Sequence, residues 1–178
     1  MKKRVLCLLA HGFEEIETVT PVDLLRRAGV DVVLASLAHG PVVGRSGIRL
    51  EPDATLDSLN PADFDLLFIP GGPAVALLRE DGRAAEIACQ FAEAGKTIAA
   101  ICAGPLVLKD AGLLEGRDFT AHFSVHDDLP GVSSERVVID GNLITSRGAG
   151  TALDFGLALV HHLAGKAVEE QVTEAVMA

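Results

Sequence analysis

The sequence Thr97-Ile98-Ala99-Ala100-Ile101-Cys102-Ala103-Gly104-Pro105 decides how the rest of the chain is interpreted. It predicts a short apolar strand that ends at a cysteine and is followed by a helix over 106–111. Ala100 and Gly104 are small, as a sharp strand-to-helix turn requires, and hydrolases present a nucleophile on such a turn. Pro105 suits the first turn of a helix. We therefore predict that Cys102 is a nucleophile whose pKa is lowered at a helix N-terminus. The alternative is a small buried cysteine that closes a core strand.

The composition predicts a single globular domain over residues 1–178. Hydrophobic residues make up 49% of the chain but aromatic residues only 4%. A core of Val, Leu, Ile and Ala suits a parallel sheet that is covered by helices. The net charge of -10 disfavours non-specific binding of nucleic acid. The apolar run over 5–10 is too short to cross a membrane, so we expect a first strand, no membrane contact and a cytoplasmic location.

The three cysteines have no close or repeated spacing, and no Cys/His pattern for a metal is present. We therefore expect free thiols, as in a reducing cytosol, and no metal. Cys7 lies inside an apolar run and is interpreted as a core residue. Cys89 lies on a predicted helix and could belong to the core or to the surface.

Strands and helices alternate along the predicted chain. The first helix follows Glu14 and ends at Gly29, and Pro21 should kink it or restart it with Thr20 as the cap. Asp53 is expected to cap a short helical turn through Leu59. Strands are predicted over 4–10, 31–36, 65–69, 97–101, 119–125 and 137–145, with short strands within 39–50 and a hairpin turn at 140–142. Further helices are predicted over 74–78, 82–94, 106–111, 151–163 and 168–177.

This alternation predicts a doubly wound α/β sandwich. In such sheets the ligand crevice lies beyond the carboxyl ends of the strands. The segments at those ends are 11–17, Gly71-Gly72 and Cys102-Ala103. Gly71-Gly72 could be a tight turn that needs a positive φ. We favour a second interpretation, in which an amide of this pair joins the Ala103 N–H as an oxyanion hole beside Cys102.

Acidic residues and histidines supply candidates for proton transfer. Glu14, Glu15 and Glu17 cluster after the first strand, and Glu14 or Glu15 should be solvated at the helix start. One inward acid could bond the Cys102 sulfur, but periodicity does not choose between Glu14 and Glu17. His122 and His126 could each be a base or an ordinary surface residue. The glycine-rich turn over 147–151 lacks the lysine of a phosphate loop, so we expect it to line the site or to form a subunit contact.

Four motifs carry a resemblance over nearly the whole chain. They are Leu9-Ala10-His11-Gly12-Phe13-Glu14-Glu15-Ile16-Glu17-Thr18-Val19, Leu67-Phe68-Ile69-Pro70-Gly71-Gly72, Ala99-Ala100-Ile101-Cys102-Ala103-Gly104-Pro105 and Leu143-Ile144-Thr145-Ser146-Arg147-Gly148-Ala149-Gly150-Thr151. In this order they resemble the ThiJ/PfpI family of the class I glutamine amidotransferase-like superfamily, and within it the branch of the parkinsonism-associated protein deglycase.

The resemblance implies a flavodoxin-like sandwich and a homodimer that packs partly through the first helix. It implies that Cys102 is the nucleophile, that Glu17 contacts it, and that His122 is the site histidine. The oxyanion amides map to Gly72 and Ala103. Departures from the family pattern at Ser46, Glu51 and Ala149 bear on the dimer contact and on secondary redox chemistry.

The function implied is a cysteine-dependent deglycase or glyoxalase without a cofactor, which acts on methylglyoxal or its protein adducts and releases lactate. The protease-like branch of the family carries His directly after its cysteine, so Ala103 argues against peptidase activity. We expect Glu17 to keep its proton while Cys102 is a thiolate. The alternative is a redox sensor or chaperone, in which Cys102 is oxidised to a sulfinic acid that a partner recognises.

Overall fold

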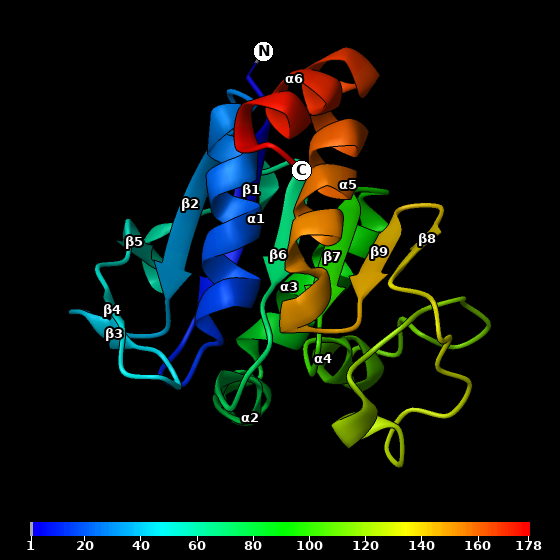
Figure 1. Cartoon of the computed structure of the whole chain (residues 1–178). Coiled ribbons are helices and arrows are strands. Elements are labelled where there is room, and N and C mark those ends of the chain that lie inside the picture. The colour runs from blue at the N-terminus through cyan, green and yellow to red at the C-terminus, as the bar shows by residue number, and fades with distance from the viewer. Residues whose placement is uncertain (1) are drawn as a thin grey trace.

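One sheet of seven strands runs through the centre of the computed structural model, which describes residues 2–178. Its strand order is β5-β2-β1-β6-β7-β9-β8, and only β8 runs antiparallel to its neighbour. The carboxyl ends of β1, β6 and β7 therefore meet at one edge (Figure 1). The strands are β1 Arg4–Leu9, β2 Asp31–Ser36, β5 Ala54–Thr55, β6 Leu66–Ile69, β7 Thr97–Ile101, β8 Val137–Asp140 and β9 Leu143–Ser146.

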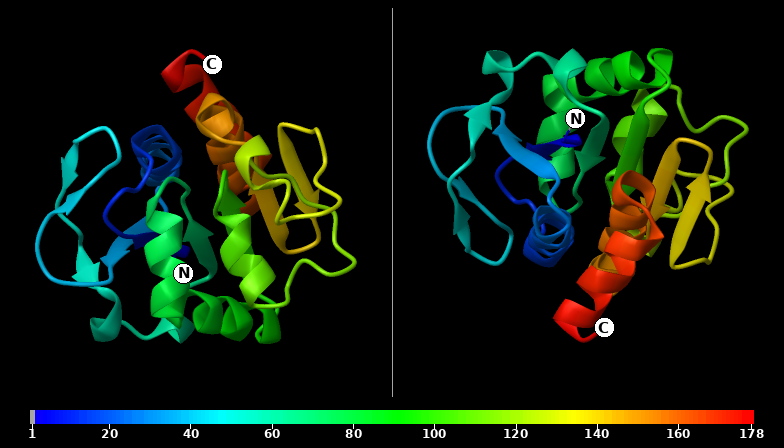
Figure 2. Two further views of the ribbon diagram at one scale, coloured as in Figure 1. Left: turned by 90° about the horizontal axis from the view of Figure 1, so that it is seen from below. Right: turned by 90° about the horizontal axis from the view of Figure 1, so that it is seen from above.

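Helices cover both faces of this sheet, as Figure 2 shows. One face carries α1 Glu15–Arg27, α5 Ala152–Ala164 and α6 Lys166–Val176. The other carries α2 Ala74–Asp81, α3 Arg83–Glu93 and α4 Pro105–Asp110. A separate small sheet pairs β3 Val42–Val43 with β4 Arg49–Leu50. This arrangement confirms the predicted flavodoxin-like sandwich.

The apolar sequence of β1 explains why both faces are covered. Successive strand residues point to opposite faces of a sheet. Val5 and Cys7 accordingly pack into the apolar cluster that includes α1 and α5, while Leu6 and Leu8 pack into the cluster on the α2–α4 side. All four side chains are buried. A strand that is buried on both faces reads as a continuous apolar run, which is how parallel strands are recognised in sequence.

Two local predictions were wrong, and one of the two alternatives for Pro21 is excluded. Helix α1 continues through Pro21 and does not restart there with Thr20 as its cap. Its buried face, which includes Val22 and Leu25, packs against the rest of the fold and favours one continuous helix. Asp53 does not cap a helix: its carboxylate accepts the Leu34 N–H at 2.8 Å, and β5 follows it. A 3-10 turn over Leu56–Ser58 is what remains of the expected helical turn.

The second wrong prediction is the strand over 119–125. The chain there is irregular until the 3-10 turn Phe123–Val125. Its backbone donors bond to groups outside a strand ladder: the Thr120 N–H donates to Thr145 Oγ1 at 2.9 Å, and the His122 N–H donates to the Cys102 carbonyl at 3.0 Å. The second of these bonds fixes His122 beside the end of β7.

Candidate active site

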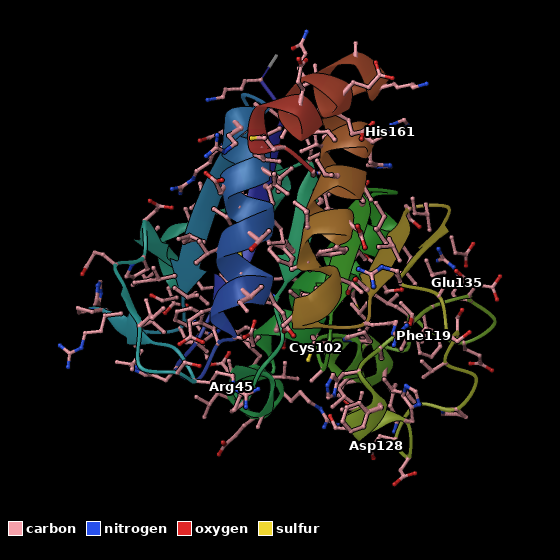
Figure 3. All side chains as sticks on the ribbon, in the orientation of Figure 1. Arg45, Cys102, Phe119, Asp128, Glu135 and His161 are labelled. Atoms are coloured by element: carbon pink, nitrogen blue, oxygen red, sulfur yellow. The ribbon has the colours of Figure 1, made fainter. Side chains whose placement is uncertain are left out.

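Cys102 sits on the sharp turn that its sequence predicts. It follows β7 directly and has φ 65°, in the left-handed region that residues other than glycine rarely adopt. Strain of this kind is found at functional sites, where the surrounding structure maintains it. Gly104 is needed for the turn, because a Cβ there would lie 2.7 Å from the Ile69 carbonyl oxygen and 3.0 Å from that of Ile101. Figure 3 places Cys102 at the lower end of the sheet, beyond the carboxyl end of β7.

Glu17 is the acid that adjoins Cys102: a Cβ on Gly71 would lie 3.0 Å from the Cys102 Sγ and closer still to Glu17 Oε2, and each of the two groups shifts the pKa of the other. Helix α1 directs this carboxyl group inward, and only 2% of the residue is exposed. Its Oε2 is fully buried and has no hydrogen-bond partner of good geometry among residues 2–178. An unpaired buried oxygen of this kind is costly unless it carries a proton or receives one during a reaction.

The other two acids are buried, so the prediction that Glu14 or Glu15 is solvated was wrong. Glu14 caps α1, and its carboxylate accepts the Glu17 N–H at 2.7 Å. Glu15 Oε1 accepts the Ser46 N–H at 2.7 Å and thereby holds the loop over 44–48 against the helix. The loop covers the Glu15 side chain, whereas Glu14 lines the cavity beside Cys102. Periodicity left Glu14 and Glu17 open as the acid beside the sulfur. In the structure Glu17 is that acid, and Glu14 caps helix α1.

Two backbone amides are directed at the sulfur. The N–H groups of Gly72 and Ala103 lie beside it in the same cavity and favour its charged form. Gly72 has φ 88° and a Cβ there would lie 2.6 Å from the Gly12 carbonyl oxygen, so the position needs glycine twice over. Gly71 has a different part: its amide faces the Glu17 carboxyl group rather than the sulfur. The predicted pair of Gly72 and Ala103 is thus the one that is placed to bind an oxyanion.

The two ionisable groups share one negative charge over a wide range of pH. Burial, with a smaller contribution from the Glu14 charge, raises the pKa of Glu17 to about 7. Burial and then the charge of Glu17 raise the pKa of Cys102 to about 12. This is the opposite of the expected acidic thiol, because the effect of burial exceeds that of the amides. Above a pH of about 7 the pair carries one charge, and Cys102 is a thiolate only when the shared proton is on Glu17.

His122 is brought to the site, whereas His126 lines a neighbouring cavity. Burial, followed by the charges of His126 and Arg45, lowers the pKa of His122, so the ring is neutral at pH 7. The Ser124 N–H donates to its Nδ1 at 3.2 Å. The proton of the neutral ring is therefore on Nε2, which makes this nitrogen a donor.

These groups surround a cavity of about 320 Å³. Sequence reasoning missed two of its residues, Arg45 and Ser124, since a loop and a turn carry them in and no motif marks them. The expectation that the glycine-rich turn lines the site is met by Ala149. Arg45 and the loops that follow α4 lie on opposite sides of Cys102 (Figure 3). The lining consists of Glu14, Glu17, Arg45, Gly72, Pro73, Cys102, Ala103, His122, Ser124 and Ala149.

The other cysteines are not part of this cavity. Cys7 is fully buried, and burial raises the pKa of its thiol. Cys89 is half-buried and its thiol donates to the Ala111 carbonyl oxygen at 3.6 Å. Within residues 2–178, no three His, Cys, Asp or Glu side chains are grouped as metal ligands would be. No helix in the same range is both long and apolar enough to span a membrane.

Comparison with known proteins identifies the family. The model of the DJ-1/PfpI family matches residues 3–162. The chain belongs to the DJ-1/PfpI family. It is 38% identical to the deglycase PfpI of Pyrococcus furiosus over 151 residues, which cover 83% of this chain and 91% of the relative. It is 40% identical to the Parkinson disease protein 7 homolog of Danio rerio over 178 residues, which cover 96% of this chain and 94% of the relative.

A solved structure of the same family has the same fold. The crystal structure of Drosophila melanogaster DJ-1beta superposes with a TM-score of 0.93 at 35% sequence identity and covers 99% of this chain and 98% of its own. The predicted resemblance to the family is thereby confirmed. The homodimer that it implies stays a prediction, although Ile16 and Val19 of α1 leave apolar side chains 53% and 44% exposed.

Proposed function

We propose that the protein is a cysteine-dependent deglycase that converts methylglyoxal, free or attached to proteins, into lactate. The observation that carries the proposal is the elbow at Cys102, where one sulfur meets a buried proton carrier and two amides. Similarity to the P. furiosus deglycase supports enzymatic activity of this class. The dicarbonyl substrate and the lactate product are what the family resemblance implies, and we propose them for this chain together with the steps below.

The first step adds the Cys102 sulfur to the aldehyde carbon of methylglyoxal. If the thiol still carries its proton, that proton passes to the Glu17 carboxylate as the S–C bond forms. The aldehyde oxygen becomes an oxyanion at the position where the amides of Gly72 and Ala103 converge. Fixed donors in a half-buried pocket stabilise such a charge without reorganisation, and the loss of one donor costs about a hundredfold or more in rate.

The second step moves a proton from the former aldehyde carbon to the neighbouring carbon. The aldehyde carbon is oxidised to a thioester and the ketone carbon is reduced to an alcohol, so no external oxidant is needed. Water then cleaves the thioester to give lactate and the free thiol. Glu17 has a pKa of about 7 and can carry the proton in both directions. His122 donates from Nε2 to the oxygens.

Lactate release tests this proposal. With methylglyoxal as the substrate and a chelator present, we expect lactate from the parent protein and none above background from Cys102→Ser. The Cys89→Ser variant is the matched control and should keep the parent rate. The same assay with methylglyoxal-treated N-acetyl-cysteine examines deglycation. Equal lactate release by the parent and by Cys102→Ser would contradict the proposal.

A second candidate function is redox sensing at the same cysteine. Among the described residues that line the cavity, no second cysteine is present to form a disulfide with Cys102. An oxidised sulfur would instead place its oxygens against the amides of Gly72 and Ala103. Oxidation also requires access to the sulfur, and Cys7 is fully buried.

Mild peroxide separates this candidate from the first. We expect Cys102 to gain two oxygens before Cys7 or Cys89 is modified, as read by intact mass and peptide mapping. A disulfide between Cys102 and Cys89 as the main product would refute the expectation. Selective oxidation in a protein that releases no lactate would favour the sensor over the deglycase.

A further inference from the structure

A second cavity, of about 490 Å³, adjoins the site and is lined by cationic side chains. His122 and Ala149 line both cavities, so a molecule whose reacting carbon is at Cys102 can extend past them into the second one. Arg136, Arg147 and His126 contribute to its wall. Among the described residues that line it, none is an aspartate or a glutamate. The net charge of the chain is -10, so a cavity wall that has arginines and no acidic side chain differs in charge from the chain as a whole.

The register of the sheet places the two arginines beside the nucleophile. Ile101 pairs with Ser146, and the Cys102 N–H donates to the Ser146 carbonyl at 2.9 Å. Arg147 is therefore the neighbour of Cys102 on the adjacent strand end, about 5 Å away from backbone to backbone. Arg136 lies opposite it across the β8–β9 hairpin, and the Arg147 N–H donates to the Arg136 carbonyl at 3.3 Å.

The two guanidinium groups differ in whether their charge is already balanced. Arg136 bonds to the Asp154 carboxylate at 2.6 Å and to the Gly150 carbonyl at 2.9 Å. Arg147 is exposed, and its guanidinium donates to the Ser134 carbonyl at 3.3 Å. Within residues 2–178, Arg147 is in no ion pair. Its planar fork of donors therefore remains free for a carboxylate or a phosphate, which it can bind in bidentate fashion.

Phe123 supplies an apolar wall at the junction of the two cavities. Its side chain is 77% exposed, although an aromatic ring gains from burial. The ring lies 4.2 Å from that of His122, measured between centroids. A short carbon chain that runs from Cys102 towards Arg147 would cover this ring.

We propose that the cavity at Arg147 is an anion subsite, which selects small carbonyl compounds that carry a carboxylate or a phosphate a few bonds from the reacting carbon. The proposal deepens the proposed deglycase function. It rests on that function only for the claim that the bound anion belongs to a substrate. The binding of an anion beside Cys102 does not depend on that function. The test therefore begins with a reaction that needs no turnover.

Charged thiosulfonates of equal length measure the subsite directly. The Cys102 sulfur displaces methanesulfinate from the reagent and forms a mixed disulfide, whose rate is read at Cys102 by peptide mapping. The reagents carry a sulfonate or a trimethylammonium group two carbons from the reacting sulfur. We expect the ratio of the sulfonate rate to the ammonium rate to fall roughly tenfold in Arg147→Gln, and less at high salt.

Two controls isolate the charge at this position. Arg49→Gln removes one positive charge from the exposed strand β4, on the opposite side of the molecule (Figure 1), and should leave the ratio unchanged. The rate with neutral methyl methanethiosulfonate should be equal in the parent and both variants. A ratio that is unchanged in Arg147→Gln, or lowered equally in Arg49→Gln, would overturn the subsite.

Turnover then tests whether the anion belongs to a substrate. The hemithioacetals of methylglyoxal with 3-mercaptopropionate and with 2-mercaptoethanol share the reacting carbon and differ in charge. We expect the parent to prefer the carboxylate by kcat/KM, and Arg147→Gln to lose that preference. If the parent turns over neither compound, the deglycase function fails while the thiosulfonate ratio still decides the subsite. Equal preference in parent and variant counts against the selection of anionic substrates.

Discussion

Alanine in place of Gly71 is expected to lower both the alkylation rate of Cys102 and any lactate release by about a hundredfold. A Cβ on Gly71 would lie 2.5 Å from the Cys102 Cβ, 3.0 Å from its Sγ, and closer still to Glu17 Oε2. The sulfur or the carboxyl group must move to make room. A displacement of about 1 Å at a reacting centre costs roughly a hundredfold in rate. The backbone of Gly71 is outside the left-handed region, so the substitution adds no strain there and tests space alone.

Gly150→Ala is the matched control for this experiment. Gly150 also lacks a positive φ, and a Cβ there would meet nothing within 4 Å. It should keep the parent rates of alkylation by iodoacetamide and of lactate release from methylglyoxal, because neither reagent carries an anion into the second cavity, which Gly150 lines. Iodoacetamide labelling followed by peptide mapping gives the first rate, and an enzymatic lactate assay the second. Parent-like rates in Gly71→Ala would mean that the contacts of Glu17 and Cys102 around this glycine do not govern reactivity.

The elbow could be predicted from sequence because its requirements are local. The turn at Cys102 is marked by its sequence neighbours, the small residues Ala100 and Gly104 and the helix-starting Pro105. The left-handed backbone of Cys102 shows that the sharp turn they predict is present. The parallel strands were equally clear, because strands that are buried on both faces appear as apolar runs. Such features depend on residues that are neighbours in the chain.

Features that depend on distant contacts could not be predicted in this way. Residues 119–125 alternate apolar and polar side chains like a strand, yet Thr145 and Cys102 accept their backbone donors. The sequence predicts a solvated helix start at Glu14 and Glu15, but the loop over 44–48 bonds to Glu15 and buries it. In both cases a segment from elsewhere in the chain changes the outcome.

The residues of the candidate site also fall into those that local sequence predicts and those that it does not. Cys102 and its amides follow from the residues themselves, whereas the choice of Glu17 and His122 came from the family resemblance. Arg147 belongs to the glycine-rich turn that motif reasoning interpreted without regard to its charge. The direction of the Cys102 pKa was wrong, because a motif specifies amides but not the depth at which they are buried.

The Glu17→Gln variant should have a larger free energy of unfolding than the parent at pH 8. We expect the difference between variant and parent to be about 3 kcal/mol larger at pH 8 than at pH 4.5. The pKa of Glu17 is raised from its ordinary value of 4.5 to about 7, mainly by burial. A raised pKa means that the folded protein keeps a proton which the unfolded chain releases. The resulting stability is fully present below pH 4.5 and is lost as the pH rises through 7. Each pKa unit corresponds to about 1.4 kcal/mol, and glutamine has no proton to lose.

Urea unfolding of the parent and the variant at pH 4.5, 6 and 8 measures this difference. Other titrating groups act on both proteins alike and therefore cancel. Glu115→Gln removes an exposed carboxyl group and should follow the parent at every pH. For a chain of this size, 3 kcal/mol corresponds to a rise in Tm of roughly 6 to 12 °C at pH 8. A difference that stays constant with pH would show that the pKa of Glu17 is not raised.

The same variant should lose turnover while it gains stability. Glutamine can still donate a hydrogen bond to the Cys102 sulfur, and the carboxylate charge that raises the pKa of Cys102 is absent. Alkylation of Cys102 should therefore persist. Proton transfer between sulfur, oxygen and carbon has no carrier left at this position, which costs about 10² to 10⁴ in rate. Lactate release at the parent rate by Glu17→Gln would assign the proton transfer to another group, for which His122, in the lining of the same cavity, is a candidate.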